Sequence, residues 1–230
     1  MYPKQCEIFE GLGVPKRKIC FIPNGIAREY FQIYDDKAFR EKFNIGKRKI
    51  ITFIGRLTPH KRVEDLIRAI GKIIRKYKDL VVVIAGPDKG ALYSIKNLVN
   101  ELGINPYVLL LGEINEKEKH ELLDSTDIFV NPSSYEAFGL AVAEAMAKGI
   151  PVISADNPGA KYLLDDGKCG LLYKTGDVEE LSDKILYLIT NSDAGKRIGE
   201  CCRVRALEFS WERIAESIEN KILKCIEKDP

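Results

Sequence analysis

Two carboxylates stand eight residues apart in the stretch 131–149, NPSSYEAFGLAVAEAMAKG. Glu144 is the single polar residue of 140–147, so its helix is predicted to be buried around most of its circumference. A buried carboxylate is costly unless it is hydrogen-bonded, and Glu144 is therefore expected to have a partner. Glu136 falls near the start of the same predicted helix, and eight steps of about 100° leave the two acids about 80° apart.

Backbone N–H groups lie between these two acids. Phe138, Gly139 and Leu140 come at the predicted N-terminus of the helix, where unpaired N–H groups and the helix dipole favour an anion. Two acids that flank a phosphate cradle fit a sugar diphosphate, whose hydroxyl groups donate hydrogen bonds to them. The alternative makes Glu136 a helix-start acid and Glu144 a core residue paired with a lysine or a backbone group.

Positive charge is concentrated in the segment 54–62, IGRLTPHKR. Gly55 lets a ligand approach the backbone, Arg56 can contact two phosphate oxygens at once, and Lys61 supplies a compact second cation. The alternative is a solvated basic loop. His60 in the same segment is interpreted as a surface residue.

Several classes of protein and site are excluded by what the sequence lacks. It contains no P-loop, no strand-linked G-x-G-x-x-G and no D-x-D pair that would hold a divalent cation on a diphosphate. Two histidines and six scattered cysteines without a C-x-x-C pair give no metal-site spacing, so neither a metal nor a cofactor is predicted. The cysteines are expected to be reduced thiols, with no disulfide.

Charge and hydropathy restrict the partners and the location. A net charge of +2, from 36 basic and 34 acidic residues, gives no basic surface for nucleic acid. No apolar run approaches the ~18 residues that cross a bilayer, and residues 1–7 lack the apolar core of a secretory signal, so a cytoplasmic location is predicted.

Short β-branched runs alternate with helical patterns along the first three quarters of the chain. Strands are predicted at 19–22, 49–54, 80–85, 108–111, 127–130 and 151–155. Helices are predicted at 63–77, 91–102, 116–124 and 138–148, and after Tyr173 at 178–190, 193–208 and 211–227. Continuous apolar strands that alternate with helices indicate an α/β fold, a single Rossmann-like, doubly wound parallel sheet of about six strands with a helical C-terminus.

Ligands of such sheets bind beyond the carboxyl ends of the strands. The loops that would meet a ligand are therefore 55–61, 86–90, 112–115 and 131–139. Arg56, Lys61 and Glu136 all fall in these loops.

A series of short motifs resembles a known family. In chain order they are FIPNG at 21–25, GRL at 55–57 with Lys61, AG at 85–86, LG at 111–112, PS at 132–133, the two glutamates, GIPVI at 149–153 and GKCG at 167–170. Their order and spacing resemble the C-terminal, donor-binding domain of the retaining GT-B glycosyltransferases called group 1 or family 4. The resemblance runs from about residue 19 to the end.

The resemblance implies roles for the acids and the cations. Arg56 and Lys61 would hold the diphosphate of a nucleotide sugar and stabilise the leaving group without metal, and both are expected to be catalytic together with Glu136, which would touch the transferred sugar. Glu144 would bind the ribose hydroxyls.

The same resemblance implies backbone contacts to the nucleotide sugar. Gly55, Phe138, Gly139 and Leu140 would contact the sugar or the phosphate. Gly86, Gly112 and Ile114 would border the base.

The sequence departs from the family pattern in length and at one motif. Lys161 stands where the family commonly has a glutamate. A complete GT-B enzyme has two Rossmann-like domains, whereas this chain has room for one, so residues 1–18 are interpreted as the end of a preceding domain with its linker and 19–230 as the nucleotide-sugar domain. The acceptor domain would lie in another part of the polypeptide or in a separate chain, and any peripheral membrane association would depend on it.

Three functions remain open at this point. The first is the nucleotide-sugar half of a hexose-transferring enzyme, inactive by itself. The others are a non-catalytic nucleotide-sugar-binding subunit and a GT-B-like sugar-nucleotide epimerase. A product assay with the nucleotide sugar alone distinguishes the last of these.

Overall fold

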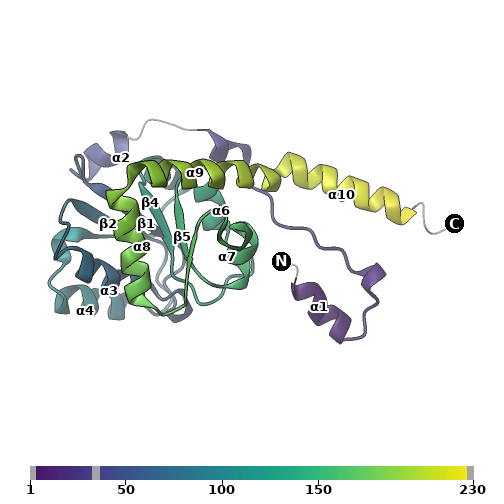
Figure 1. Ribbon diagram of the computed structural model, residues 1–230, viewed down its shortest axis with the longest axis horizontal. Coiled ribbons are helices and arrows are strands. Elements are labelled where there is room, and N and C mark those ends of the chain that lie inside the picture. The colour runs from purple at the N-terminus through teal and green to yellow at the C-terminus, as the bar shows by residue number, and fades with distance from the viewer. Residues whose placement is uncertain (1–3, 33–36, 227–230) are drawn as a thin grey trace.

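The computed structural model describes residues 4–32 and 37–226, with the side chains of 6–32 and 37–223. Six parallel strands form one sheet in the order β3-β2-β1-β4-β5-β6 (Figure 1). Their bounds are β1 Lys49–Ile54, β2 Leu80–Ala85, β3 Val108–Gly112, β4 Ile128–Asn131, β5 Val152–Ala155 and β6 Leu171–Tyr173. The predicted doubly wound α/β sheet is confirmed.

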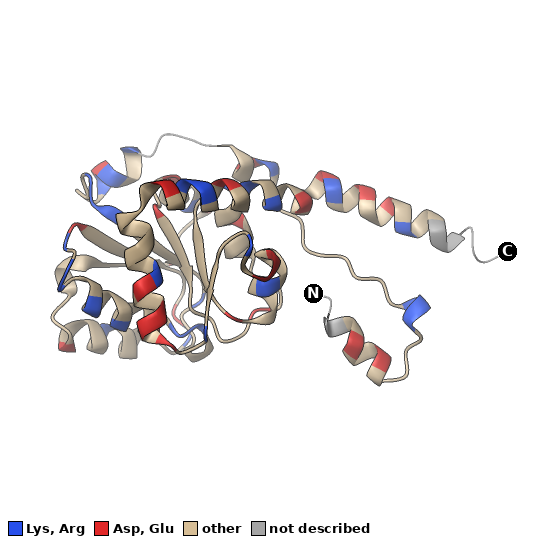
Figure 2. Ribbon diagram, in the orientation of Figure 1, with Lys and Arg blue, Asp and Glu red and all other residues tan. Residues whose placement is uncertain are grey.

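Helices cover both faces of the sheet because the strands are apolar on both. In β2, Val82 and Ile84 join the cluster under α3 and α8, whereas Val81 and Val83 pack with Phe39 of α2 on the other face. Lys49 is the single charged residue of the six strands, and charged side chains otherwise lie on helices and loops (Figure 2). The helices are α1 Lys4–Gly11, α2 Lys37–Lys42, α3 Val63–Ile73, α4 Leu92–Glu101, α5 Glu116–Asp124, α6 Leu140–Ala147, α7 Pro158–Leu163, α8 Val178–Thr190, α9 Ser192–Ala206 and α10 Trp211–Ile226.

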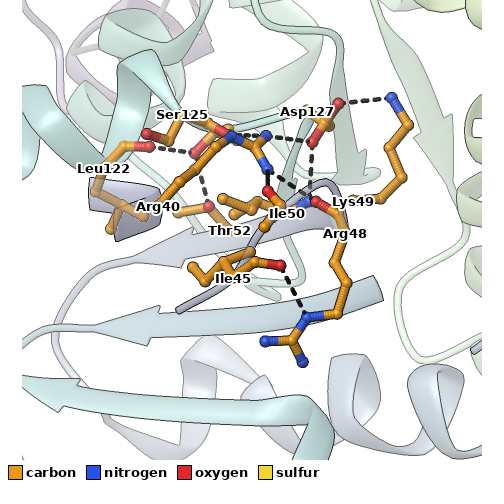
Figure 3. A network of polar contacts seen from close by, with 11 residues as sticks. Arg40, Ile45, Arg48, Lys49, Ile50, Thr52, Leu122, Ser125 and Asp127 are labelled. Carbon is orange, nitrogen blue, oxygen red and sulfur yellow. Dashed lines mark hydrogen bonds and ion pairs between the residues drawn. The ribbon is translucent and has the colours of Figure 1, made fainter. Parts of the chain in front are cut away.

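A polar network fixes the amino ends of β1 and β4. Asp127 accepts hydrogen bonds from Lys49 Nζ at 2.7 Å, from the Ile50 N–H at 2.9 Å and from Arg40 of α2 at 3.1 Å (Figure 3). One carboxylate thus joins α2 to the two central strands. Because this network lies at the amino edge, it leaves the carboxyl edge free for a site.

The segment that precedes the sheet is joined by backbone hydrogen bonds to the segment between α9 and α10. The Ile26 N–H donates to Phe209 O at 2.7 Å, and the Trp211 N–H donates to Ile26 O at 3.2 Å. A Cβ on Gly25 would lie 2.2 Å from the Trp211 ring, so this crossing requires glycine. Beyond it α10 extends away from the sheet, and Lys221 donates back to Phe21 O at 2.5 Å (Figure 1).

The structure corrects two of the predicted elements and adds two that were not predicted. Residues 19–22 form no strand, and the sixth strand is β6 instead, a three-residue element too short for its periodicity to be recognised. Helix α7 was not predicted, since Pro158 and Gly159 mask its short pattern. Helix α6 begins at Leu140 rather than 138, so Glu136 lies in the preceding loop and the predicted angle between the two acids does not apply.

The expectation of reduced cysteines throughout is also wrong. Cys169, before β6, forms a disulfide with Cys201 of α9, with 5.1 Å between their Cα atoms. Their separation of 32 residues carries no sequence signature. The fold alone brings the two side chains within bonding range.

Candidate functional site

The candidate site lies where the strand order changes direction, between β1 and β4. Ligands of doubly wound sheets bind outside the carboxyl ends of the strands at this point. Here the loops after β1 and β4 touch, because the N–H and the hydroxyl of Ser134 both donate to the carbonyl of His60, at 2.9 and 3.0 Å. The predicted cations and the predicted acid Glu136 therefore meet at one edge.

Lys61 and Glu136 form an ion pair across these loops. Lys61 Nζ lies 2.5 Å from Glu136 Oε1, and the side chains are 13% and 16% exposed. Lys61 is the last residue of the 3₁₀ turn Pro59–Lys61, after which Arg62 adopts a left-handed conformation (φ 52°) and precedes α3. The Lys61 side chain thus reaches the loop after β4, where Glu136 lies.

Arg56 lies two residues after the end of β1 and is exposed. Within the described part of the chain, its side chain has no hydrogen-bonding partner or ion pair, which leaves its guanidinium available to an anion. His60 is exposed, as predicted, and its Nδ1 lies 3.1 Å from Thr58 Oγ1.

Helix α7 holds the loop that carries Glu136. Asn157 Nδ2 donates to Ser133 O at 2.9 Å, and the Gly159 N–H donates to Glu136 O at 3.1 Å. A Cβ on Gly159 would lie 2.7 Å from that same carbonyl. Glycine at this position thus lets α7 approach and fix the backbone of Glu136.

The predicted anion cradle falls at the start of α6. Gly139 precedes the helix with φ of 92°, a conformation that favours glycine. Leu140 is exposed, whereas Phe138 is buried and packs edge-on against Phe209, with 5.7 Å between ring centroids. The Phe138 side chain therefore belongs to the core, and only its backbone faces this loop.

The structure pairs Glu144 with a lysine, as the alternative to a ribose-binding role expects, although the sequence does not identify which lysine. Glu144 Oε1 lies 3.0 Å from Lys119 Nζ of α5, and both side chains are 15% exposed. Burial raises the pKa of the Glu144 carboxyl, and the Lys119 ammonium opposes that rise. Tyr30 and Glu116 lie beside this pair, 2.7 Å apart from hydroxyl to carboxylate. No spacing in the sequence relates residues 30, 116, 119 and 144.

Glycines lie side by side at the carboxyl ends of β1, β2 and β3. The Gly86 N–H donates to Gly112 O at 2.6 Å, and a Cβ on Gly86 would lie 1.9 Å from Gly55 O. Backbone packing accounts for glycine at Gly86. Ile114, in the loop after β3, is half-buried against the cluster around Phe39.

Lys161, at the position that departs from the family pattern, forms an exposed ion pair with Asp156 at 2.8 Å. A hollow lies elsewhere, between α3, α4 and α8, with Arg68, Lys72 and Arg75 on its wall. None of the predicted site residues lines it.

Residues 4–32 and 37–226 contain no group of three or more His, Cys, Asp and Glu residues placed to hold a metal ion. No helix in the described part of the chain is long and apolar enough to cross a bilayer.

Comparison with known proteins places the chain in a family. The pattern of the family "Glycosyl transferases group 1" matches residues 35–204. D-inositol 3-phosphate glycosyltransferase of Corynebacterium jeikeium is 31% identical over 222 residues, which are 92% of this chain and 53% of that protein. Its counterpart in Nocardia farcinica is 28% identical over 219 residues, 92% of this chain and 49% of that protein. The chain thus spans about half the length of the curated relatives it matches.

Solved structures share the fold. Anabaena Alr3699/HepE, crystallised with UDP and glucose, superposes with a TM-score of 0.88 at 21% identity, over 97% of this chain and 62% of that one. Sucrose-phosphate synthase of Thermosynechococcus elongatus superposes with a TM-score of 0.84 at 24% identity, over 99% of this chain and 58% of that one. The chain belongs to the group 1 glycosyltransferase family, of whose GT-B architecture it forms one Rossmann-like half.

Proposed function

We propose that this chain is the nucleotide-sugar-binding half of a retaining glycosyltransferase, with the ligand seated along the loops after β1 and β4. Residues 19–230 would form this half, and 1–18 would lead from the acceptor-binding half. The observation that carries the proposal is the ion pair between Lys61, the expected phosphate-binding cation, and Glu136, the expected hydroxyl-binding acid. Their charged atoms lie 2.5 Å apart at the switch point of the sheet.

The ion pair would exchange partners when the ligand binds. The Lys61 ammonium would turn to the diphosphate, joined by the exposed Arg56 guanidinium, and Glu136 would accept hydrogen bonds from the sugar hydroxyls. Gly139 and Leu140 would supply N–H groups at the start of α6. Glu144 would bind the ribose, and the loops at Gly86, Gly112 and Ile114 would border the base.

These groups favour departure of the nucleoside diphosphate. The bond between the anomeric carbon and the diphosphate oxygen breaks, and its electron pair leaves with the diphosphate, whose charge Arg56 and Lys61 stabilise. The acceptor oxygen bonds to the anomeric carbon on the same face, and its proton passes to a diphosphate oxygen. Configuration at that carbon is retained.

The relatives support a uridine nucleotide as the first probe. Anabaena HepE has been crystallised with UDP-glucose, and the two D-inositol 3-phosphate glycosyltransferases are enzymes of sugar transfer. We therefore choose UDP first and GDP and ADP next. The acceptor remains outside this proposal.

A thermal-shift panel of these nucleotides tests the proposal. A ligand at ~100 times its Kd stabilises the fold by roughly 2.7 kcal/mol, which raises Tm measurably. Arg56→Ala and Lys61→Ala should each reduce the shift, whereas Lys161→Ala, which removes an exposed lysine paired with Asp156, should leave it unchanged.

Binding should also survive EDTA, since Arg56 and Lys61 are the cations assigned to the diphosphate. If no nucleotide or nucleotide sugar raises Tm of the folded chain, the proposal is wrong. If EDTA abolishes the shift, the metal-free assignment is wrong.

A further inference from the structure

Lys119 is held between two acids and an aromatic ring. Its Nζ lies 3.0 Å from Glu144 Oε1 and 3.0 Å from Glu116 Oε1, and 5.1 Å from the centre of the Tyr30 ring. The Tyr30 hydroxyl donates to the other oxygen of Glu116 at 2.7 Å. The ammonium is thus fixed from three directions, although Glu116 itself is 74% exposed.

Lys119 lies near the start of α5, close to the loop that follows β3. Helix α5 starts directly after the loop 112–115, and a capping box sets its first turn, with the Glu118 N–H donating to Asn115 Oδ1 at 2.9 Å and the Asn115 N–H to Glu118 Oε2 at 3.1 Å. Lys119 therefore lies one turn beyond that loop. Its ion pair ties the loop after β3 to the middle of α6.

The ion pair also decides the state of the Glu144 carboxylate. With 15% of its side chain exposed, Glu144 loses much of its hydration, and burial favours the neutral acid. A neutral acid accepts hydrogen bonds less well than a carboxylate. The Lys119 ammonium opposes that effect of burial, and its contact at 3.0 Å fixes the orientation of the Glu144 carboxylate.

We infer that Lys119 is a positioning residue that holds Glu144 ready for the ribose hydroxyls of the nucleotide. The inference rests on the proposed function. Lys119 itself would not touch the ligand. Removing its charge should therefore weaken binding only of nucleotides that carry the hydroxyls.

Calorimetric titration with two probes tests this inference. UDP carries both ribose hydroxyls, and its 2′,3′-dideoxy analogue has the same base and phosphates without them. Lys119→Met keeps the length of the side chain and should lower the affinity for UDP about tenfold or more, the scale of one charged hydrogen bond, while changing that for the analogue little. Lys119→Arg should restore most of the UDP affinity.

Lys117→Met is the matched control. Lys117 lies on the same helix and is 86% exposed, with Glu121 at 3.8 Å, so its loss should change neither affinity. Should Lys119→Met fail to fold by circular dichroism, Lys119→Gln replaces it in the same comparison.

The outcomes separate the inference from the proposed function. Equal loss for both probes, or no loss for UDP, overturns the positioning role of Lys119. Equal affinity of the unmodified chain for the two probes overturns it as well, because Glu144 would then not bind the ribose. If the unmodified chain binds neither probe, the proposed function itself fails.

Discussion

At the scale of single residues, the site is built from charges that are partly removed from water. Lys61 with Glu136 and Lys119 with Glu144 are ion pairs whose side chains are all 13–16% exposed. Removing the two charges of a pair from water costs free energy. Their mutual attraction offsets that cost only while both partners are present. A ligand that replaces one partner must therefore offer equivalent charge or hydrogen bonds.

Replacing Glu144 tests how much its charge contributes to nucleotide binding. Glu144→Gln should weaken UDP binding by about 1.5–3 kcal/mol in titration calorimetry, because a charged acceptor is lost at unchanged shape. Unchanged affinity together with a large fall in Tm would return Glu144 to a purely structural role.

The pH dependence of UDP binding gives a second prediction at Glu144. Burial raises its pKa, Glu116 adds to the rise, and Lys119 and the Tyr30 hydroxyl oppose it, so the net direction is above the ordinary value of 4.5. The carboxylate is therefore lost as pH falls, at a higher pH than for an exposed glutamate. As pH falls through this range, the affinity for UDP should decline more than the affinity for the 2′,3′-dideoxy analogue, whose phosphates titrate alike. In Glu144→Gln, the two affinities should change with pH in the same way.

The cysteines differ in reactivity for physical reasons. Burial raises the pKa of the Cys202 thiol to about 12, whereas Cys20 is exposed. Iodoacetamide at pH 8 should therefore label Cys20 in the native chain and leave Cys202 unmodified until unfolding, as read by peptide mass spectrometry. Cys169 and Cys201 should react only after reduction, and labelling of either without reductant would contradict the disulfide.

At the scale of elements, the loops after β1, β2 and β4 are placed by backbone contacts more than by side chains. The Ser134 N–H donates a hydrogen bond to the His60 carbonyl, and the Gly159 N–H donates one to the Glu136 carbonyl. Gly55 packs directly on Gly86. The first and third contacts join two loops at the carboxyl edge, and the second joins α7 to the loop after β4. Substitutions that add atoms there should disturb the fold and the site together.

Comparing Gly86→Ala with Gly90→Ala measures how much the packing of Gly86 on Gly55 contributes to stability. Both glycines have positive φ, 141° and 102°, but a Cβ at Gly86 would lie 1.9 Å from Gly55 O whereas one at Gly90 meets nothing within 4 Å. Gly86→Ala should therefore lower the free energy of unfolding by about 1–3 kcal/mol more than Gly90→Ala. Equal urea midpoints and slopes for Gly86→Ala and Gly90→Ala would contradict this, because the ends of β1 and β2 would then move apart at little cost in free energy.

At the scale of the whole molecule, one Rossmann-like half carries the proposed nucleotide-sugar site, and relatives are about twice as long. Orientation of two reactants accounts for ~7 to 11 kcal/mol of a reaction barrier. In the proposed function, a second domain would orient the acceptor at the edge that carries Arg56 and Glu136.

The 230 residues by themselves should therefore bind UDP and transfer no sugar at a useful rate. Mass spectrometry of mixtures with UDP-glucose and a broad acceptor panel checks this expectation. Robust turnover would show that the active site is completed within this chain. Epimerised or hydrolysed nucleotide sugar, formed without acceptor, would favour the epimerase instead.

The sequence by itself determined the layers of the fold and the edge of the sheet at which a ligand site is predicted. Apolar runs such as 80–85 could only be buried strands, and their alternation with helices dictated a parallel sheet. Because parallel strands end at a common edge, the sequence predicts that Arg56, Lys61 and Glu136 lie at one edge of the sheet.

Tertiary structure alone decided which groups touch. Lys119 with Glu144, and Cys169 with Cys201, are separated by 25 and 32 residues and lie on different elements, so no period of helix or strand relates them. The strand β6 was missed for a similar reason, since three residues are stabilised by pairing with β5 rather than by their own pattern. Local propensity acts over a few residues, whereas these contacts depend on how α5, α6, α9 and β6 pack around the sheet.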